Sequence, residues 1–306
     1  MSDDTNAIAS TGDDRRRGPL KAGEPVLLVD RKQRNYLTVL EAGGEFHTHV
    51  GVVPHDDLIG RDEGITVRSG RGATYLVMRP TLSEFILNMK RGAQVIYPKD
   101  LGPILMLADI FPGANVVESG IGSGALSMTL LRAGALVTGY EIREDFASRA
   151  MKNVQAFHGD VTGRYTVKIG DIYDGIEETG VDRILLDLPE PWQVVPHAAK
   201  ALRLGGLLVA YTPSITQAAQ LREALSSAPF EMAETIEVLN RGWHVEGRAV
   251  RPNHRMVAHT AFLTSARRVE PYESEAASAE AAATAEAPAE TPRGAGDSGQ
   301  TEPSET

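Results

Sequence analysis

From about residue 93 onward, short apolar runs suited to β-strands alternate regularly with stretches of helical pattern. The run NVVESG precedes GALSMTLLRAG, and ALVTGYE precedes EDFASRAMKNVQAFHG. Such alternation is typical of a mainly parallel sheet with helices on both faces. The last two runs, EMAETIEVLNRGW and HTAFLTSARR, have little helical pattern between them, so we expect an antiparallel hairpin at a sheet edge. The sequence therefore predicts an α/β fold built on a doubly wound sheet with an antiparallel C-terminal hairpin.

Residues 20–80 show a different pattern of short alternating runs. PVLLVD, NYLTVL and ATYLVMRP are separated from one another by Gly-rich or Asp-rich turns, which is typical of a small antiparallel β domain. The next stretch, 81-TLSEFILNMKRG-92, has Thr81 and Glu84 in capping-box spacing and Gly92 as a stop signal. We therefore expect a small β domain over 20–80 and an α/β domain over 81–268 that begins with a helix.

The charge of the chain is concentrated at its ends. The formal net charge is −10, yet residues 270–306 carry nine Asp and Glu residues against one Arg, and residues 1–17 carry four Asp against three Arg. The C-terminal segment is rich in Ala, Glu, Ser, Thr and Pro, a composition typical of disordered chain. We expect disordered tails over 1–19 and 269–306. The nearly neutral remainder neither favours nor excludes an anionic partner.

The N-terminus lacks the apolar run of a signal peptide, and no segment has 18 consecutive apolar residues. The absence of cysteine excludes disulfides and thiolate chemistry. His47, His49 and His55 lack a convergent acid or cysteine pattern, so we interpret them as surface or core residues. The sequence predicts a cytoplasmic protein that binds neither membrane nor metal.

A glycine-rich loop, 118-ESGIGSGAL-126, comes after the first strand of the predicted sheet. Gly120, Gly122 and Gly124 allow the backbone to turn sharply and to approach a ligand at a helix N-terminus. This spacing alone is weak evidence, because a plain tight turn has a similar composition. No lysine of a triphosphate-binding loop comes after the glycines, which disfavours an NTPase.

Carboxylates end the next strands of the predicted sheet. Glu141 lies 21 residues after Gly120, the spacing of an acid that grips ribose hydroxyls, and Asp171 is placed to accept a hydrogen bond from an adenine amino group. A solvated acid at a helix start or in a polar turn is the alternative for each. Because the carboxyl ends of parallel strands share one edge, we predict a nucleoside-bearing cofactor there, either a nicotinamide dinucleotide or S-adenosylmethionine.

The fourth strand ends in 184-ILLDLPEPW-192, where Asp187 interrupts an apolar run and two prolines stiffen the residues after it. A buried carboxylate without a partner costs several kcal/mol. Asp187 therefore has either a structural donor or a ligand that brings one. The structural alternative is an Asp that caps the helix beginning near Trp192.

These stretches together resemble the class I S-adenosylmethionine-dependent methyltransferases, and more narrowly the tRNA adenine-N1 methyltransferases that act on adenine-58 of the T-loop. The narrower resemblance rests on 94-QVIYPKDLGPIL-105, LLDLPEPW, 241-RGWHVEGRAVRP-252 and 254-HRMVAHTAFL-263. It covers roughly residues 20–268. It implies a Rossmann-like methyltransferase domain behind a small β domain, S-adenosylmethionine as cofactor, tRNA as partner and a homotetramer.

The resemblance also implies roles for individual residues. Glu141 is expected at the cofactor ribose and Asp171 at its adenine. Asp187 corresponds to the catalytic acid of the family and also borders the cofactor, and Tyr97 is expected at the substrate pocket as a second catalytic residue. The remaining cofactor-binding residues implied are Gly120, Gly122, Ser123, Gly124, Ala125, Leu126 and Phe146.

Methylation of adenine N1 needs little base catalysis, because N1 already carries a lone pair. The base must instead leave its stack and be aimed at the methyl group. The product purine is cationic, with charge spread to N6, and a carboxylate that accepts a hydrogen bond from N6 orients the ring and stabilises that charge. We therefore predict that the donor missing from Asp187 is the amino group of the substrate.

Binding of a folded RNA requires phosphate contacts. Basic residues gather near the final hairpin, and we expect substrate contacts from Arg241, His244, Arg248, Arg251 and Arg255. A solvated loop with structural ion pairs is the alternative. Trp192 is predicted either to stack on the flipped base or to pack in the core. Arg68, Arg71 and Arg79 of the β domain are weaker candidates for RNA contacts.

The sequence leaves other functions open. A class I methyltransferase acting on a protein carboxylate or a small molecule would share the cofactor loop, but typically lacks the acid followed by Pro-x-Pro-aromatic. A nicotinamide dehydrogenase is disfavoured because no proton-relay His or Tyr–Lys pair comes after the fourth strand. A non-catalytic tRNA-binding subunit is disfavoured by the intact glycine loop together with Glu141 and Asp187.

Overall fold

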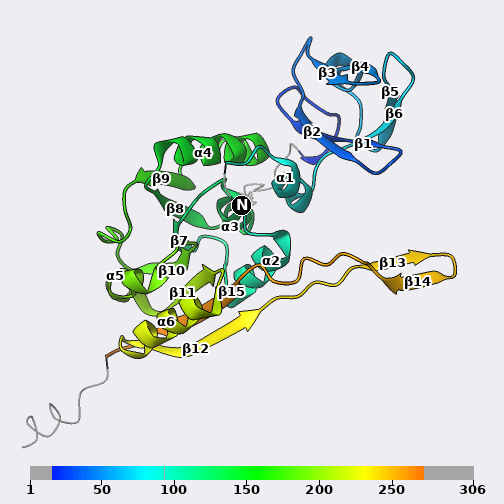
Figure 1. Cartoon of the computed structure of the whole chain (residues 1–306). Helices are drawn as coiled ribbons and strands as arrows, with labels where there is room; N and C mark the ends of the chain where they lie inside the picture. The colour runs from blue at the N-terminus through cyan, green and yellow to red at the C-terminus, as the bar shows by residue number, and fades with distance from the viewer. Residues whose placement is uncertain (1–15, 93, 272–306) are drawn as a thin grey trace, which may run out of the picture. The chain divides into compact units, whose positions relative to one another are not determined.

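The computed structural model describes residues 16–92 and 94–271 (Figure 1). The predicted tails therefore lie almost entirely outside the described residues. Those up to Glu270 form one compact unit. No helix in the described ranges is long and apolar enough to cross a membrane, and they contain no cluster of three or more His, Cys, Asp or Glu residues arranged to hold a metal ion.

The predicted small antiparallel β domain is present before the first helix. One four-stranded antiparallel sheet has the order β2-β1-β6-β5, and β3 and β4 form a separate antiparallel pair. Alternate residues of these strands, such as Val26, Leu28 and Val77, are fully buried in a common apolar core. The strands are β1 (Pro25–Asp30), β2 (Asn35–Val39), β3 (Glu45–Thr48), β4 (Gly51–Pro54), β5 (Ile65–Arg68) and β6 (Thr74–Met78), with a short 3-10 helix η2 (His55–Asp57).

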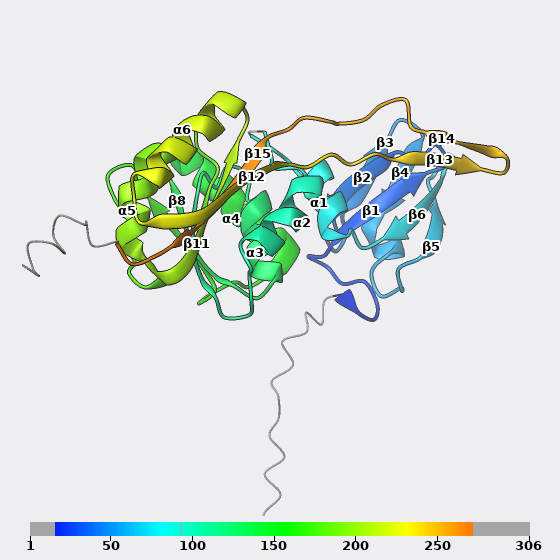
Figure 2. The ribbon, with the colours of Figure 1, turned by 90° about the horizontal axis from the view of Figure 1, so that it is seen from below.

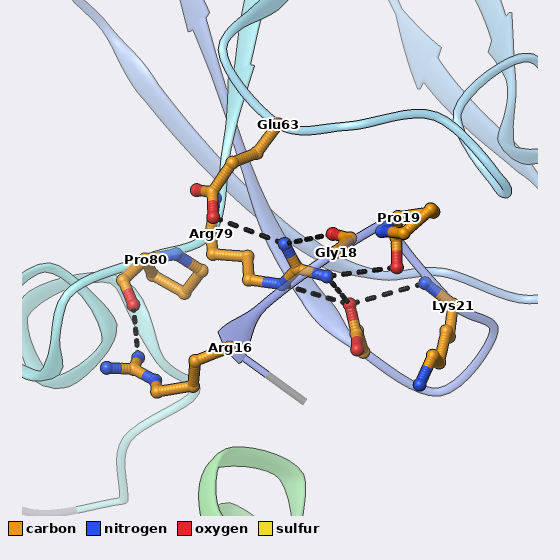
Figure 3. Close-up of polar contacts among 8 residues, drawn as sticks. Arg16, Gly18, Pro19, Lys21, Glu63, Arg79 and Pro80 are labelled. Atoms are coloured by element: carbon orange, nitrogen blue, oxygen red, sulfur yellow. Dashed lines mark hydrogen bonds and ion pairs between the residues drawn. The ribbon is translucent and has the colours of Figure 1, made fainter. Parts of the chain in front are cut away.

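Arg79 lies within a buried ion-pair network of this domain, which corrects its assignment as an RNA contact. Its side chain is 8% exposed and pairs with Glu24 at 2.9 Å and Glu63 at 3.2 Å. Figure 3 shows its guanidinium group also donating to the backbone oxygens of Gly18 and Pro19. The sequence pattern missed this because the partners are distant along the chain. Arg79 therefore holds the segment before β1 against the domain.

The helix predicted from its capping box is α1 (Leu82–Asn88). The Thr81 side chain accepts a hydrogen bond from the Glu84 backbone, and the Glu84 side chain accepts one from Thr81. The helix ends at Asn88, before Gly92. A second helix, α2 (Pro98–Leu107), was not predicted. Its signal was Pro98, since proline is favoured at the first helical position.

The predicted doubly wound sheet has seven strands in the order β12-β15-β11-β10-β7-β8-β9. Strands β7 to β11 pair in parallel, whereas β15 is antiparallel to both of its neighbours. The predicted antiparallel pairing of the last two large strands is thus confirmed, with β15 inserted between β11 and β12. The strands are β7 (Asn115–Ser119), β8 (Leu136–Glu141), β9 (Tyr165–Ile169), β10 (Val181–Leu186), β11 (Leu202–Thr212), β12 (Phe230–Glu237) and β15 (Phe262–Arg268).

Helices cover both faces of this sheet, as the alternation predicted. Apolar residues of α1, α2, α3 (Ala125–Arg132) and α4 (Glu144–His158) pack against one face. The other face is covered by η3 (Pro191–Val194), α5 (Val195–Ala201) and α6 (Ile215–Ser226). Successive residues of β7 alternate between the two cores, with Val116 on the first face and Val117 on the second. Because β7, β8, β9 and β10 pair in parallel, their carboxyl ends meet at one edge of the sheet.

Between β12 and β15 the chain forms an arm over residues 239–259. Figure 1 shows it, in yellow and orange, running out from the sheet to a two-stranded hairpin and back. The hairpin consists of β13 (Trp243–Glu246) and β14 (Ala249–Pro252). The same arm is visible in the turned view of Figure 2. The basic residues predicted to bind RNA therefore lie on an extended arm.

Candidate active site

The glycine loop connects β7 to α3 and touches the end of β10. A Cβ atom at Gly120 would lie 2.0 Å from the carbonyl oxygen of Asp187, and the φ of Gly120 is +83°. Both features require glycine. Gly122 and Gly124 also have positive φ, of +56° and +84°, and Gly124 is the N-cap of α3. The loop therefore brings the α3 N-terminus and Asp187 to one point.

The α3 N-terminus offers backbone N–H groups as ligand donors. Ala125 and Leu126 are 4% and 5% exposed and pack in the core, so their side chains are not available to a ligand. No side chain caps the helix, and the first N–H groups of a helix have no partner within it. Ser123 is also buried, and its hydroxyl accepts a hydrogen bond from the Gly92 backbone at 3.4 Å. The N-terminus of α3 is therefore suited to bind an anionic group.

Glu141 lies at the end of β8 beside this loop. One carboxylate oxygen accepts a hydrogen bond from Gly122 N at 3.2 Å and the other from Arg143 N at 3.1 Å. Asp171 comes after the neighbouring strand, and one of its carboxylate oxygens accepts from Tyr173 N at 2.9 Å. The two acids occupy adjacent strand ends, since Glu141 is paired with Ile169 in the β8–β9 ladder. The predicted group of acids at one edge of the sheet is therefore present.

Asp187 receives no hydrogen bond on its carboxylate from the described residues, although its backbone N–H donates to Ser119 O at 2.9 Å. Burial alone raises the pKa of this carboxyl to about 7, while the side chain keeps partial access to solvent. Neither η3 nor α5 has a side-chain cap, so Asp187 is not a capping residue. Asp187 was predicted to have either a structural donor or a ligand that brings one. No structural donor is found among the described residues, so the ligand is the explanation that remains.

Phe146 and Trp192, two aromatic residues predicted to contact a ligand, pack against other side chains of the protein. The Arg143 guanidinium carbon lies 4.0 Å from the centre of the Phe146 ring, which is partly exposed on α4. Trp192 is partly buried in η3 and packs against the second apolar core. No hydrogen bond or ring contact between described residues joins either side chain to the glycine loop, and their ligand roles stay predictions.

Tyr97 precedes α2 and lines a recess of about 280 Å³. Arg255 of the returning arm lines the same recess, so two predicted substrate residues meet there; the other lining residues are Ser83, Leu87, Pro98, Lys99, Asn240, Met256 and Val257. Tyr211, near the end of β11, was not predicted. Burial raises its pKa to about 12, and it is close enough to Tyr97 and Asp187 for both to affect its titration.

A buried polar cluster holds both ends of the arm to α2. Lys99 Nζ donates to Asp100 at 2.8 Å, to the Val238 carbonyl at 2.7 Å and to the Thr260 hydroxyl at 2.6 Å. The Thr260 hydroxyl in turn donates to Asp100 at 2.7 Å. Val238 and Thr260 flank the arm, and Lys99 lies two residues after Tyr97. The cluster thus fixes the arm beside Tyr97.

Replacing Lys99 by methionine is expected to lower the free energy of unfolding by about 3–5 kcal/mol, because it leaves the fully buried Asp100 without its cation. The matched control is Arg203→Met, which breaks a pair with Asp182 in which Arg203 is 45% exposed and should cost below about 1 kcal/mol. Urea denaturation of both variants measures this. Equal losses in the two variants would contradict the role assigned to the cluster.

The arm presents the predicted basic side chains to solvent. Arg241, Arg248, Arg251 and Arg255 are exposed and make no side-chain hydrogen bond or ion pair with any described residue. His244 lies 3.5 Å from Glu246, measured between Nε2 and Oε2. The alternative of structural ion pairs is therefore not found for the four arginines.

Three further residues at the edge of the sheet were missed from the sequence. Ile142 and Ile169, at the ends of β8 and β9, are 64% and 57% exposed. Large apolar side chains directly after strand ends were the available signal, since an apolar group facing solvent at a ligand edge suits a flat hydrophobic ligand. Glu118, within β7, is 0% exposed, and its acidic character inside an apolar strand was a second signal.

The strand order, the single antiparallel strand, the glycine loop and the acids at adjacent strand ends define a methyltransferase of class I, with a Rossmann-like sheet. A family model described as "tRNA methyltransferase complex GCD14 subunit" matches residues 73–287, and one described as "TrmI-like N-terminal" matches residues 18–67. The chain belongs to this tRNA methyltransferase family.

Named relatives cover most of the chain. It is 42% identical to the tRNA (adenine(58)-N(1))-methyltransferase TrmI of Thermus thermophilus, over 80% of this chain and 96% of the relative. It is 35% identical to a tRNA (adenine(57)-N(1)/adenine(58)-N(1))-methyltransferase of Methanocaldococcus jannaschii, over 79% and 94%.

Two solved structures share the fold. One, a tRNA (m1A58) methyltransferase TrmI of Aquifex aeolicus, has a TM-score of 0.72 and 30% identity over 83% of this chain and all of that chain. The other, a SAM-dependent O-methyltransferase of Thermotoga maritima, has a TM-score of 0.78 and 34% identity, over 83% of this chain and 96% of that chain.

Proposed function

We propose that this protein transfers a methyl group from S-adenosylmethionine to N1 of adenine-58 in the T-loop of tRNA, forming 1-methyladenosine. The observation that carries the proposal is Asp187, whose main-chain carbonyl packs against Gly120 of the glycine loop and whose carboxylate receives no hydrogen bond from the described residues. The names of the relatives from Thermus, Methanocaldococcus and Aquifex, all at 30% identity or more, support the same reaction.

The residues present fit S-adenosylmethionine. The N–H groups of the α3 N-terminus suit its carboxylate, and Glu141, already close to Gly122, has further lone pairs for the ribose hydroxyls. Ile142 and Ile169 would flank the adenine, with Asp171 at its amino group. When bound, the cofactor supplies a methyl group on a cationic sulfur. Phe146 remains a proposed contact at the outer side of this site.

Asp187 provides the chemistry that the transfer needs from the protein. Its carboxylate would accept a hydrogen bond from N6 of the target adenine and so orient N1 toward the methyl group. As the N1–methyl bond forms and the sulfur–methyl bond breaks, leaving a neutral thioether, positive charge passes to the purine and spreads to N6, where a carboxylate would stabilise it. The N6 proton can then pass to Asp187, because the raised pKa of this carboxyl, about 7, makes it a competent proton acceptor near neutral pH.

Aromatic side chains would hold the flipped base. Tyr97 lines the recess beside the arm, and Tyr211 lies near both Tyr97 and Asp187. A base removed from its stack is commonly held against such rings. Trp192 is proposed to form the more distant wall, with most of its surface packed against the core.

The arm is proposed to bind tRNA phosphates through its unpaired arginines and His244. Replacing Arg248 and Arg251 together by alanine should weaken tRNA binding and reduce the slope of log affinity against log salt by about 2, one for each phosphate contact. The control is Arg222→Ala, an exposed arginine on α6 outside the arm. A salt titration of binding measures the slope. A slope equal to that of the control would contradict the assignment.

We also propose that the protein works as a cytoplasmic homotetramer. The arm hairpin exposes Trp243 (58%), Val245 (71%) and Val250 (59%). Exposed apolar groups of this size commonly mark association surfaces. Light scattering of the purified protein measures the assembly directly, and a monomer would contradict it.

The reaction is tested with methyl-labelled cofactor and unmodified tRNA transcripts that carry either adenine or guanine at position 58. Label in the first transcript only is the expected result. Cofactor binding without RNA labelling would favour a methyltransferase for a protein carboxylate or small molecule. Absence of cofactor binding would favour a non-catalytic tRNA-binding subunit.

A further inference from the structure

The segment after Asp187 is held by side chains from two other parts of the chain. Pro189 has no main-chain N–H to donate, and within the described residues no main-chain hydrogen bond holds the peptide group between Pro189 and Glu190. That peptide group bonds to two side chains instead. Gln217 donates through Nε2 to the Pro189 carbonyl at 2.8 Å. The Glu190 N–H donates to the Tyr173 hydroxyl at 3.1 Å.

These two hydrogen bonds are made to one planar group. The carbonyl and the N–H of a trans peptide point in opposite directions, so Tyr173 and Gln217 hold the same peptide from opposite sides. Tyr173 comes from the loop after β9, and Gln217 from the first turn of α6. Only Leu188 separates Asp187 from this peptide. The main chain directly after Asp187 is therefore fixed in orientation by two side chains.

Both of these side chains are themselves fixed. The main-chain N–H of Tyr173 donates to Asp171 at 2.9 Å, its carbonyl accepts from His197 Nε2 at 3.0 Å, and its ring packs against the second apolar core. Gln217 Oε1 accepts from the Ser214 main-chain nitrogen at 3.0 Å and from the Ser214 hydroxyl at 2.8 Å, as part of the capping box of α6. Each side chain thus reaches the peptide from a fixed position.

The direction of the Asp187 carboxylate depends on this main chain. The carboxylate receives no hydrogen bond from the described residues, so no partner of its own sets its direction. Before the carboxylate, the Asp187 N–H is fixed on Ser119 O at 2.9 Å. After it, the peptide held by Tyr173 and Gln217 is the next fixed point. Group transfer is sensitive to such placement, since a displacement of about 1 Å can lower a rate by about 10²-fold.

We propose that Tyr173 and Gln217 are positioning residues for methyl transfer: by holding both sides of the Pro189–Glu190 peptide, they fix the direction in which the Asp187 carboxylate faces the target base. The proposal rests on the proposed methylation of tRNA and on the role of Asp187 in it. Neither residue acts on the reacting atoms directly. The side chain of Glu190 takes no part, because the hold is on its main chain.

Tyr173→Phe removes the hydroxyl and keeps the ring and the main-chain contacts with Asp171 and His197. It should lower the single-turnover rate of methyl transfer by about tenfold, with affinities for tRNA and for S-adenosylhomocysteine, the thioether product, within about twofold. Rates are measured with saturating cofactor and tRNA, on the plateau of the pH profile, where Asp187 is ionised in every variant. A residue that only stabilises the fold would lower the thermal midpoint without this split between rate and binding.

The matched control is Tyr140→Phe. The Tyr140 hydroxyl accepts from the Glu177 N–H at 3.1 Å and donates to Glu178 at 2.6 Å. It thus binds the same connection between β9 and β10 as Tyr173 does, but within the described residues it makes no hydrogen bond to the segment after Asp187. With saturating cofactor, its rate should stay within about twofold of the wild type.

Gln217→Glu tests the other side of the peptide. The substitution keeps the oxygen that caps α6 and replaces the nitrogen that donates to Pro189 by a second oxygen, so a loss of about tenfold is expected again. Because both residues hold one peptide group, the two losses should not multiply. The double variant should lose about tenfold to thirtyfold, whereas independent effects would give about a hundredfold.

Single variants that transfer methyl within about twofold of the wild-type rate would overturn the proposal and leave the reaction intact. So would a Tyr140→Phe variant as slow as Tyr173→Phe, or losses that multiply in the double variant. Should Tyr173→Phe fail to fold, Gln217→Glu decides the same question. A wild-type protein that transfers no methyl group to tRNA would overturn the proposed function as well.

Discussion

Replacing Asp187 by alanine is expected to lower kcat for tRNA methylation by about 10²–10³-fold. The Asp187 carboxylate receives no hydrogen bond from the described residues, and without it the developing charge on the adenine amino group would lose its partner. The unfolding free energy should fall little, because removal of an unpaired buried acid relieves a desolvation cost. Single-turnover methyl transfer with saturating cofactor measures the loss.

Glu190→Ala is the matched control for this prediction. Glu190 is an exposed acid in the same Pro-Glu-Pro segment, and its carboxylate accepts from Gln193. Its removal should leave kcat within about twofold, as for surface changes away from special features. A comparable loss in both variants would show that the segment, and not the Asp187 carboxylate, is needed.

The pH dependence of the wild type is set by the same residue. The pKa of Asp187 is raised to about 7 by burial, and the reaction requires its ionised form. Activity should therefore rise with pH through about 7 and level off above it. This ascending limb should be absent from the residual activity of Asp187→Asn.

Replacing Gly120 by alanine is expected to abolish cofactor binding and to lower the free energy of unfolding by about 2–5 kcal/mol. The added Cβ would lie 2.0 Å from the Asp187 carbonyl oxygen, and the φ of +83° is strained for alanine. Relief of the clash must separate the β7 loop from the end of β10, which is where the proposed site is assembled.

Gly122→Ala separates strain from crowding in this loop. Its φ is also positive, at +56°, but a Cβ there would lie 3.9 Å from its nearest neighbour, the Gly120 carbonyl oxygen. We expect a cost of about 1–2 kcal/mol, with cofactor binding weakened but measurable. Thermal denaturation with and without S-adenosylhomocysteine measures both effects. If the two variants behave alike, the contact between Gly120 and Asp187 is not important.

The fold was predictable because its signals are local. The alternation of strand-like and helical stretches, the capping box of Thr81 and the glycine spacing all act within a few residues. The insertion of β15 between β11 and β12 was not predictable, because strand order depends on packing between distant segments. The same limit applies to Arg79, whose partner Glu24 lies 55 residues away.

The candidate site was predictable where the chain places an acid at a strand end. Glu141, Asp171 and Asp187 lie at the shared edge for this reason. Glu118 and Tyr211 were missed because the features that make them candidates are burial and proximity to residues on other strands. A linear sequence pattern contains neither feature. The arm arginines were identified by composition, but their freedom from ion pairs became visible only in the structure.

The central claim is most directly tested by locating the methyl group on the RNA. Unmodified tRNA transcript is incubated with the purified protein and S-adenosylmethionine, and reverse transcription is used to map the blocked position. We predict a stop at adenine-58 that is present with wild-type protein and Glu190→Ala and lost with Asp187→Ala. A stop elsewhere, or one that persists undiminished in Asp187→Ala, would contradict the proposed reaction.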